Sequence, residues 1–288
     1  MRKSAFICFL VLCILSLSLT TCEALGIISV DKSKIRMTIP AGASKGGAIT
    51  IDNPTEYPKQ IRAYLEDWYY LSTIEGTKEF QPAGTSELSC AKWISFFPAE
   101  FTIPPYGRQK INYTVKVPQE TKGGHYAILF LETSGPPAAQ EQGVNVGVLV
   151  RVGCLFYVEA EGTINRSAAI DNLNVAQNDG AGYQIRANFK NTGNTDITAS
   201  GTFNIINEKG MVYARGKFNN VYTFPKDTAV LIANWKESLP AGRYDLILTF
   251  NLGKAIEEAG LGRGRLMTKE AEIEISPDKE AKILQDLR

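Results

Sequence analysis

Two stretches far apart in the chain repeat one pattern, and this repeat limits the fold more than any other feature. The first starts at Ala48 and reads Ala-Ile-Thr-Ile-Asp-Asn-Pro-Thr, and the second starts at Tyr183 and reads Tyr-Gln-Ile-Arg-Ala-Asn-Phe-Lys-Asn-Thr-Gly. A second phrase follows each of them in the same order, as Phe101-Thr-Ile-Pro-Pro-Tyr-Gly with Gly123-Gly-His-Tyr and as Phe224-Pro-Lys-Asp with Ala241-Gly-Arg-Tyr. The two copies lie about 130 residues apart, and a period this much longer than that of a solenoid repeat indicates duplicated domains. The sequence therefore predicts two tandem Ig-like β-sandwiches.

Strand signals recur along the chain and are separated by turns that contain Gly or Pro. Helical signal is confined to one or two turns at Lys254–Ala259 and to the tail, where Ser276 fits an N-cap and Pro277 the first helical position. We predict an all-β chain with a signal peptide at 1–24, sandwiches at 25–160 and 161–275, and a short helical or frayed tail at 276–288. The strands predicted for the first sandwich are Lys34–Ile39, Ala48–Asp52, Gln60–Tyr70, Lys92–Ile103, Lys110–Val117, Tyr126–Glu132 and Val144–Val158.

The first residues have the pattern of a secretory signal peptide. Arg2 and Lys3 precede an apolar run, and the small-residue cleavage rule places the cut after Ala24. The apolar run is shorter than the roughly 20 residues that a membrane-spanning helix needs, and no other segment approaches that length. A lipoprotein signal that acylates Cys22 is the alternative. The sequence predicts an exported protein, periplasmic or otherwise, without a transmembrane segment once the signal is removed.

The charge of the chain argues against nucleic-acid binding. The 288 residues include 31 basic and 30 acidic side chains, and removal of residues 1–24 takes away Arg2, Lys3 and Glu23, so the mature chain is neutral. Proteins that bind nucleic acid need an excess of basic residues to neutralise phosphates. We expect proteins or other envelope components as partners.

Two of the five cysteines, Cys90 and Cys154, remain after the signal is removed. In an exported protein two cysteines can form a disulfide. Closing the loop between Cys90 and Cys154 would add on the order of 4 kcal/mol to the free energy of unfolding in the chain-entropy model. The alternative is two unpaired thiols, since sequence alone gives no distance between them.

No motif in the sequence supports catalysis. His125 is the one histidine, so a triad, a histidine metal site or an imidazole base would each depend on it alone. The nucleophile elbow, the phosphate-binding loop and the Cys-x-x-Cys motif are all missing. We predict a protein that is not an enzyme and that has neither a cofactor nor a metal site.

The row of valines near the end of the first sandwich is the most suggestive pattern. Successive strand residues face opposite sides of a sheet, so one face carries Val144, Val146, Val148, Val150 and Val152. In one interpretation this face is donated to a partner that lacks a strand, which is a form of β-augmentation. In the other, it packs into the core of its own sandwich. Periodicity does not separate the two.

Several phrases resemble the PapD-like periplasmic pilus-assembly chaperones. The phrases are Ser29-Val-Asp-Lys-Ser-Lys-Ile-Arg-Met, Ile49-Thr-Ile-Asp-Asn-Pro-Thr, Phe97-Pro-Ala-Glu-Phe-Thr-Ile-Pro-Pro-Tyr-Gly and Leu155-Phe-Tyr, and the likeness covers roughly residues 29–157. The resemblance implies two Ig-like sandwiches, a role in pilus assembly and fimbrium biogenesis, and binding of pilin-like subunits by strand donation from the valine row.

The resemblance also implies a site that anchors the carboxylate at the C-terminus of the subunit. Members place an Arg on the first strand and a Lys on the last strand of the first sandwich, because two cations form charge-assisted hydrogen bonds with one carboxylate. This chain has Lys34 at the Arg position and Cys154 at the Lys position. Cys154 cannot serve as the second cation, so Arg36 or Arg151 takes its place or no carboxylate is bound.

A structural or adhesive envelope module is the alternative function. The second half of the chain, with Ala168-Ala-Ile-Asp-Asn-Leu-Asn-Val and Asn191-Thr-Gly-Asn, resembles generic bacterial Ig-like modules of envelope and surface proteins. In this interpretation the loops bind polysaccharide or another surface protein, and Trp68-Tyr69-Tyr70 supplies an aromatic platform.

Overall fold

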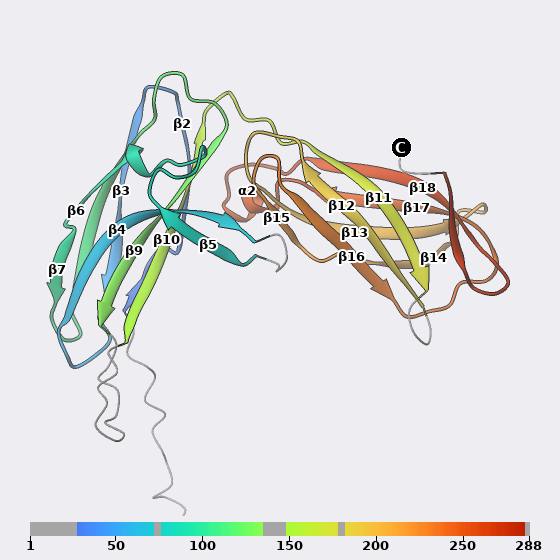
Figure 1. The fold of residues 1–288 in the computed structure, drawn as a ribbon, viewed down its shortest axis with the longest axis horizontal. Coiled ribbons are helices and arrows are strands. Elements are labelled where there is room, and N and C mark those ends of the chain that lie inside the picture. Colours follow the sequence, from blue (N-terminus) through green and yellow to red (C-terminus); the bar gives the residue numbers. More distant parts are fainter. Residues whose placement is uncertain (1–27, 72–75, 135–147, 178–181, 286–288) are drawn as a thin grey trace, which may run out of the picture.

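The chain folds into two β-sandwiches that meet end to end at a bend (Figure 1). The computed structural model describes residues 28–71, 76–134, 148–177 and 182–285. Within these ranges almost all regular structure is strand, together with one short α-helix and one 3-10 turn. The prediction of an all-β chain with two tandem Ig-like sandwiches is confirmed.

The N-terminal sandwich packs a four-stranded sheet, in the order β1-β3-β8-β6, on a six-stranded sheet, in the order β2-β10-β9-β4-β5 with β7 beside β4. Strand β8 shows why these segments form strands, since Ile111, Tyr113 and Val115 are buried and the residues between them are exposed. The strands are β1 (Ser29–Val30), β2 (Lys34–Ile39), β3 (Ser44–Asp52), β4 (Lys59–Tyr70), β5 (Lys78–Pro82), β6 (Ile94–Phe97), β7 (Glu100–Ile103), β8 (Arg108–Lys116), β9 (Gly124–Ser134) and β10 (Leu149–Ala160), and the 3-10 turn is η1 (Ala91–Trp93).

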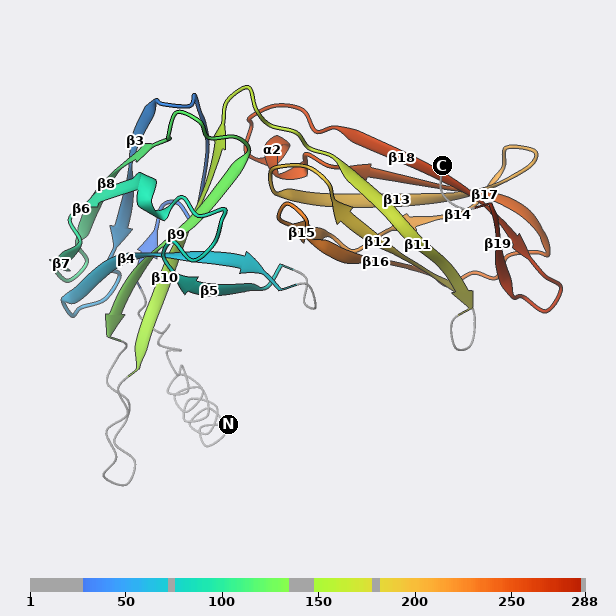
Figure 2. The ribbon, with the colours of Figure 1, turned by 45° about the horizontal axis from the view of Figure 1, so that its top comes forward.

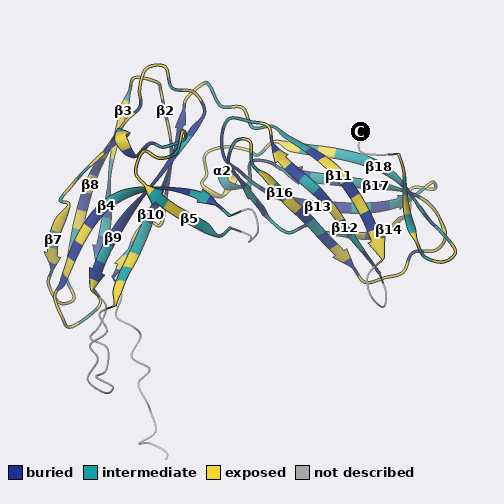
Figure 3. Cartoon of the chain, in the orientation of Figure 1, coloured by how far each residue is buried: buried dark blue, intermediate teal, exposed yellow. Residues whose placement is uncertain are grey.

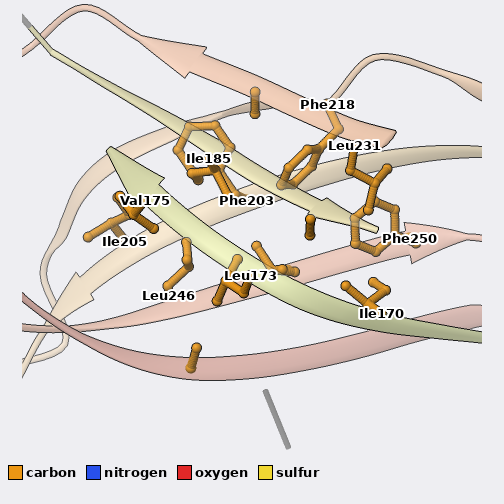
Figure 4. Close-up of a cluster of buried hydrophobic side chains, with 14 of the residues drawn as sticks. Ile170, Leu173, Val175, Ile185, Phe203, Ile205, Phe218, Leu231, Leu246 and Phe250 are labelled. Carbon is orange, nitrogen blue, oxygen red and sulfur yellow. The ribbon is translucent and has the colours of Figure 1, made fainter. Parts of the chain in front are cut away.

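The C-terminal sandwich packs a three-stranded sheet, in the order β11-β12-β16, on a six-stranded sheet, in the order β14-β13-β17-β18-β19 with β15 beside β13. Its core side chains come from both sheets, and Figure 4 shows Phe203, Phe218 and Phe250 in the layer between them. The elements are β11 (Ala168–Gln177), β12 (Tyr183–Asn191), β13 (Ile197–Asn207), β14 (Val212–Lys217), β15 (Val221–Thr223), β16 (Thr228–Trp235), β17 (Gly242–Asn251), α2 (Lys254–Glu258), β18 (Leu266–Ile275) and β19 (Ala281–Gln285).

The structure adds strands β1 and β5, which the sequence did not predict, and it corrects two predicted elements. The segment Lys92–Ile103, predicted as one strand, is divided into η1, β6 and β7, since Pro98 has no N–H for a sheet ladder. The predicted helical or frayed tail is wrong: Ser276 and Lys279 form a tight turn, and β19 returns to pair with β18. Ser276 does act as a local acceptor, but its side chain receives the N–H of Glu280 in this turn.

A buried asparagine joins two loops in each sandwich in the same way. Asn53 donates its side-chain amide to the carbonyls of Tyr57 (2.8 Å) and Ile103 (3.2 Å). Asn191 donates to the carbonyls of Thr195 (3.0 Å) and Thr223 (3.4 Å). The backbone N–H of Asn53 also donates to the carbonyl of Gly107, and that of Asn191 donates to the carbonyl of Asp227. In each sandwich this acceptor lies in the second of the two loops. The two sandwiches therefore share the same pattern of loop hydrogen bonds as well as similar residues.

Replacing either asparagine by alanine is expected to destabilise the chain. Asn53→Ala and Asn191→Ala each leave buried carbonyls without a donor, which costs about 1–3 kcal/mol of the free energy of unfolding. Urea unfolding measures this loss. Asn112→Ala, at an exposed position of β8, is the control and should change the midpoint little. Equal midpoints for Asn53→Ala and Asn112→Ala would contradict the role given to the buried amide.

Candidate functional site

The first half of β10 has an open edge. Strand β9 pairs with β10 from Leu149 to Glu159, whereas β2 pairs with it only from Leu155 to Ala160. The chain before β2 lies elsewhere, because β1 pairs with β3 in the opposite sheet and the chain changes sheets after Val30. Within the described residues, no strand pairs with Leu149–Cys154 on the side that β2 would occupy. Figure 3 shows exposed residues at this end of β10.

The backbone groups on the open edge follow from the register. The N–H of Leu155 donates to the carbonyl of Ser33, at 2.9 Å, and so points toward the β2 side. Peptide groups alternate along a strand, so those of Leu149, Arg151 and Gly153 point to the same side. Leu149 is 70% exposed. The edge therefore offers unpaired donors and acceptors beside an exposed apolar side chain.

The described valines face the core of their own sandwich. Val152 packs against the main core of the N-terminal sandwich, and Val150 is half-buried. Val148, just before β10, is 46% exposed. Val144 and Val146 lie outside the described residues. The described part of the valine row thus follows the interpretation in which it packs into the core of its own sandwich. On the opposite face of β10, the exposed apolar residue is Leu149.

Arg151 and Lys34 lie in different places. Arg151 is about 13 Å from Leu155 along β10, given a rise of about 3.3 Å per residue, and it forms an ion pair with Glu66 (3.5 Å) and lies over the ring of Phe130 (4.7 Å). Lys34 sits opposite Leu155, at the point where β2 begins. Lys34 also lines a cavity of about 500 Å³ between the sandwiches, together with Arg36, Tyr157 and Thr198. The structure does not bring Arg151 to Lys34.

Cys90 and Cys154 are two free, buried thiols. The N–H of Cys90 bonds to the carbonyl of Tyr126, whereas Cys154 sits opposite Leu129, three residues farther along β9. Three residues of strand span about 10 Å, which exceeds the roughly 7 Å limit for the Cα atoms of a disulfide. The two thiols are therefore unpaired, which was the alternative to a disulfide. Burial raises the pKa of Cys154 to about 12. Cys154 points into the core and contributes no charge to the cavity between the sandwiches that Lys34 lines, called the cleft below.

Arg36 is engaged in a buried ion cluster between the sandwiches. Its guanidinium donates two hydrogen bonds to Asp196, at 2.9 and 2.6 Å, and lies 3.4 Å from Glu159. Arg166 pairs with the same Glu159, so two guanidinium groups face two carboxylates. Burial alone would lower the pKa of Arg36, but Asp196 and then Glu159 hold it above its ordinary value. Arg36 therefore binds the other sandwich and does not replace the missing cation at Cys154.

The same junction buries an aromatic cluster. Phe224 of the C-terminal sandwich stacks on Tyr126, with ring centroids 4.1 Å apart, and lies 4.9 Å from Trp68. Tyr70 joins the cluster through its hydroxyl, which is 3.2 Å from that of Tyr157. Trp68 is 2% and Tyr70 8% exposed. These two rings form part of the junction, and they do not form the open platform that the alternative function requires.

Two adjacent glycines let the sandwiches approach closely. A Cβ at Gly123 would lie 2.3 Å from the carbonyl of Asn194, and one at Gly124 would lie 2.5 Å from the hydroxyl of Thr195. The N–H of Gly124 donates to Asn194 (2.8 Å), and the N–H of Asp196 donates to the hydroxyl of Tyr126 (2.6 Å). The phrase Gly123-Gly-His-Tyr is thus the surface that receives the second sandwich, a role that the sequence analysis missed.

His125 packs beside Trp93, with ring centroids 4.4 Å apart, and burial lowers its pKa. In the described part of the chain, no three His, Cys, Asp or Glu side chains are grouped as metal ligands. Among the described residues, none of the helices has the length and hydropathy needed to cross a bilayer.

Comparisons with known proteins find similar structures but no similar sequences. No protein-family model matches the chain, and no curated protein does. The class 5 fimbriae chaperone CfaA is 14% identical, with a TM-score of 0.49, and the match covers 84% of this chain and 98% of that one. The Escherichia coli chaperone DraB is 15% identical, with a TM-score of 0.38 and coverage of 85% and 96%.

A third similar structure is a chain from the complex of Salmonella enterica SafA pilin with the SafB chaperone. It is 10% identical, with a TM-score of 0.40, and the match covers 86% of this chain and 97% of that one.

Removing one partner of the ion cluster should loosen the junction. Asp196→Ala leaves the buried Arg36 with Glu159 alone, and breaking a buried pair costs about 3–5 kcal/mol. We expect a lower unfolding midpoint and a wider range of interdomain distances by small-angle X-ray scattering. Asp171→Ala, at an exposed position of β11, is the control. A scattering profile and midpoint for Asp196→Ala that match those of the control would show that other contacts fix the junction.

Proposed function

We propose that this chain is an exported, periplasmic chaperone that holds pilin-like fibre subunits by pairing one of their strands with the open edge of β10. The observation that carries the proposal is the open edge at Leu149–Cys154. A row of unpaired peptide groups at a sheet edge is a template for β-augmentation, and proteins that do not use such an edge usually cover or block it.

The edge is preorganised for a partner. All of Leu149–Glu159 is paired with β9 on its other side, so β10 loses little conformational entropy when a second strand binds. Leu149 and Val148 are exposed, one on each face of the strand. The backbone would supply affinity, and the side chain of Leu149 would enter the apolar groove of a subunit that lacks a strand.

The cleft fixes the direction of the bound strand. A subunit strand on this edge runs along β10 until it meets the start of β2 at Ser33 and Lys34. The positive charge of Lys34 favours a carboxylate at that point. The strand therefore runs parallel to β10, as β2 does, and ends with its C-terminal carboxylate beside Lys34.

The side chain of Leu149 provides a test with a matched control. Leu149→Asp places a charge where an apolar contact forms, and we expect it to lower recovery of the subunit at least tenfold, since a buried unpaired charge costs several kcal/mol. Leu266→Asp changes an equally exposed leucine (65% against 70%) at the first residue of β18, and should leave recovery unchanged.

The measurement is purification of the tagged protein from the periplasm of its own host, with the bound proteins quantified by mass spectrometry. A fibre subunit recovered one-to-one with the unaltered protein, and lost with Leu149→Asp only, supports the proposal. Equal recovery with both variants, at equal melting temperatures, would exclude the open edge as the binding site. Retention on cell-wall material with no subunit recovered would favour the envelope-module function.

A further inference from the structure

We infer that a cavity at the far end of the N-terminal sandwich receives a lysine or arginine side chain of the subunit that binds at the open edge. This inference rests on the proposed function and assigns a second contact to the same partner. The cavity has a volume of about 530 Å³, and we call it the end cavity. Its lining combines the first residue of the open edge with charged and polar side chains, among them Leu149, Arg62, Glu100, Glu132 and Thr133.

The end cavity lies where two neighbouring strands of the sheet separate. The ladder between β4 and β9 stops at Arg62, whereas β9 continues along β10 as far as Ser134. Beyond this ladder, residues of both strands border the cavity, namely Gln60, Ile61, Thr133 and Ser134. Figure 2 shows the start of β4 and the end of β9 at the end of the sandwich that lies away from the C-terminal sandwich. The second sandwich therefore does not cover the cavity, and a partner can reach it.

The end cavity has more negative than positive charge. Arg62 sits opposite Glu132 of β9 on one side and opposite Glu100 of β7 on the other, so one cation stands between two carboxylates in a cross-strand row. Glu132 also accepts a hydrogen bond from the hydroxyl of Tyr64, at 2.9 Å. Within the described residues, Glu100 has neither an ion pair nor a side-chain hydrogen bond. The row thus has one uncompensated carboxylate, and a further cation would complete it.

The hydroxyl of Thr133 is a second, independent indication of a ligand. Thr133 is 4% exposed, and its Oγ1 atom has no hydrogen-bond partner. A buried hydroxyl without a partner destabilises the folded chain, and a valine of nearly the same shape would avoid this cost. An ammonium or guanidinium group that enters the cavity beside Thr133 supplies the missing donor. The charges and the hydroxyl therefore favour the same kind of ligand, a basic side chain.

The position of Leu149 indicates that the basic side chain comes from the subunit. Leu149 is the first residue of β10 and of the open edge, and it also lines the end cavity. When its side chain enters the groove of a subunit, the body of that subunit covers the adjoining cavity. Carboxylates that lose water in this way need a cation from the partner, because an unpaired charge at an interface is costly. The cavity therefore selects subunits that place a basic residue beside their groove.

The sign of the charge gives the main test, by the purification of the tagged full-length protein described for Leu149→Asp. Glu100→Gln removes a carboxylate from the cavity, and we expect about threefold to tenfold lower recovery of the subunit. Arg62→Gln removes the competing cation and should raise recovery by a similar factor. Glu208→Gln, at an exposed position between β13 and β14, is the matched control and should leave recovery unchanged. Higher recovery with Glu100→Gln and lower recovery with Arg62→Gln would show an anionic ligand and overturn the inference.

Thr133→Val tests the hydroxyl separately from the charges. Loss of an unpartnered hydroxyl should leave the melting temperature equal or higher, whereas recovery of the subunit should fall about twofold to fivefold, because the basic side chain loses an acceptor. Thr114→Val, at an exposed position of β8, is the control and should change neither quantity. A lower melting temperature with unchanged recovery would show that the hydroxyl serves the fold, and would overturn the role given to Thr133.

The proposed function and this inference can fail separately. If Leu149→Asp loses the subunit while Glu100→Gln, Arg62→Gln and Thr133→Val all recover as much as their controls, strand pairing at the open edge stands and the role of the end cavity is excluded. If the unaltered protein recovers no subunit at all, the proposed function fails, and the inference that rests on it fails as well.

Discussion

The buried pairing of Arg36 with Asp196 is the interaction on which the arrangement of the cleft depends. It joins β2 of one sandwich to a loop of the other, and Glu159 and Arg166 complete a cluster with two charges of each sign. Charges removed from water are costly unless they are paired in good geometry, so the cluster favours one relative placement of the sandwiches. That placement sets the wall of the cavity that Lys34 lines.

The duplicated loops explain how the junction arose from a repeated unit. In the C-terminal sandwich, Asn191 fixes the loop that carries Thr195 and Asp196, and this loop meets Gly123 and Gly124 of the first sandwich. The equivalent loop of the first sandwich, fixed by Asn53, lies at the end away from the junction. The asparagine hydrogen bonds thus stabilise the loops of both sandwiches, but only those of Asn191 also position a loop that contacts the other sandwich.

The sequence predicted the strands and domains that local patterns determine, and it missed the contacts between residues that are far apart in the chain. Alternation and turn residues located β2 with its exact bounds, and the repeated phrases predicted both sandwiches. The tail was misread because pairing with β18 is a tertiary contact, and local signals at Ser276 favoured a helix. The pairing of Arg36 with Asp196 joins residues far apart in the chain, and nothing at either position marks it.

The open edge and the cleft are consequences of the same change of sheet near the N-terminus. Because β1 pairs with β3, the chain reaches β10 only at Ser33, so none of the described strands pairs with this edge before Leu155, and Lys34 stands at its end. Had β1 continued along β10, both the unpaired peptide groups and the site for a chain terminus would be filled. A chain that crosses between sheets at this point therefore creates the groove and its cationic end together, and sequence changes at residues 31–33 should affect both.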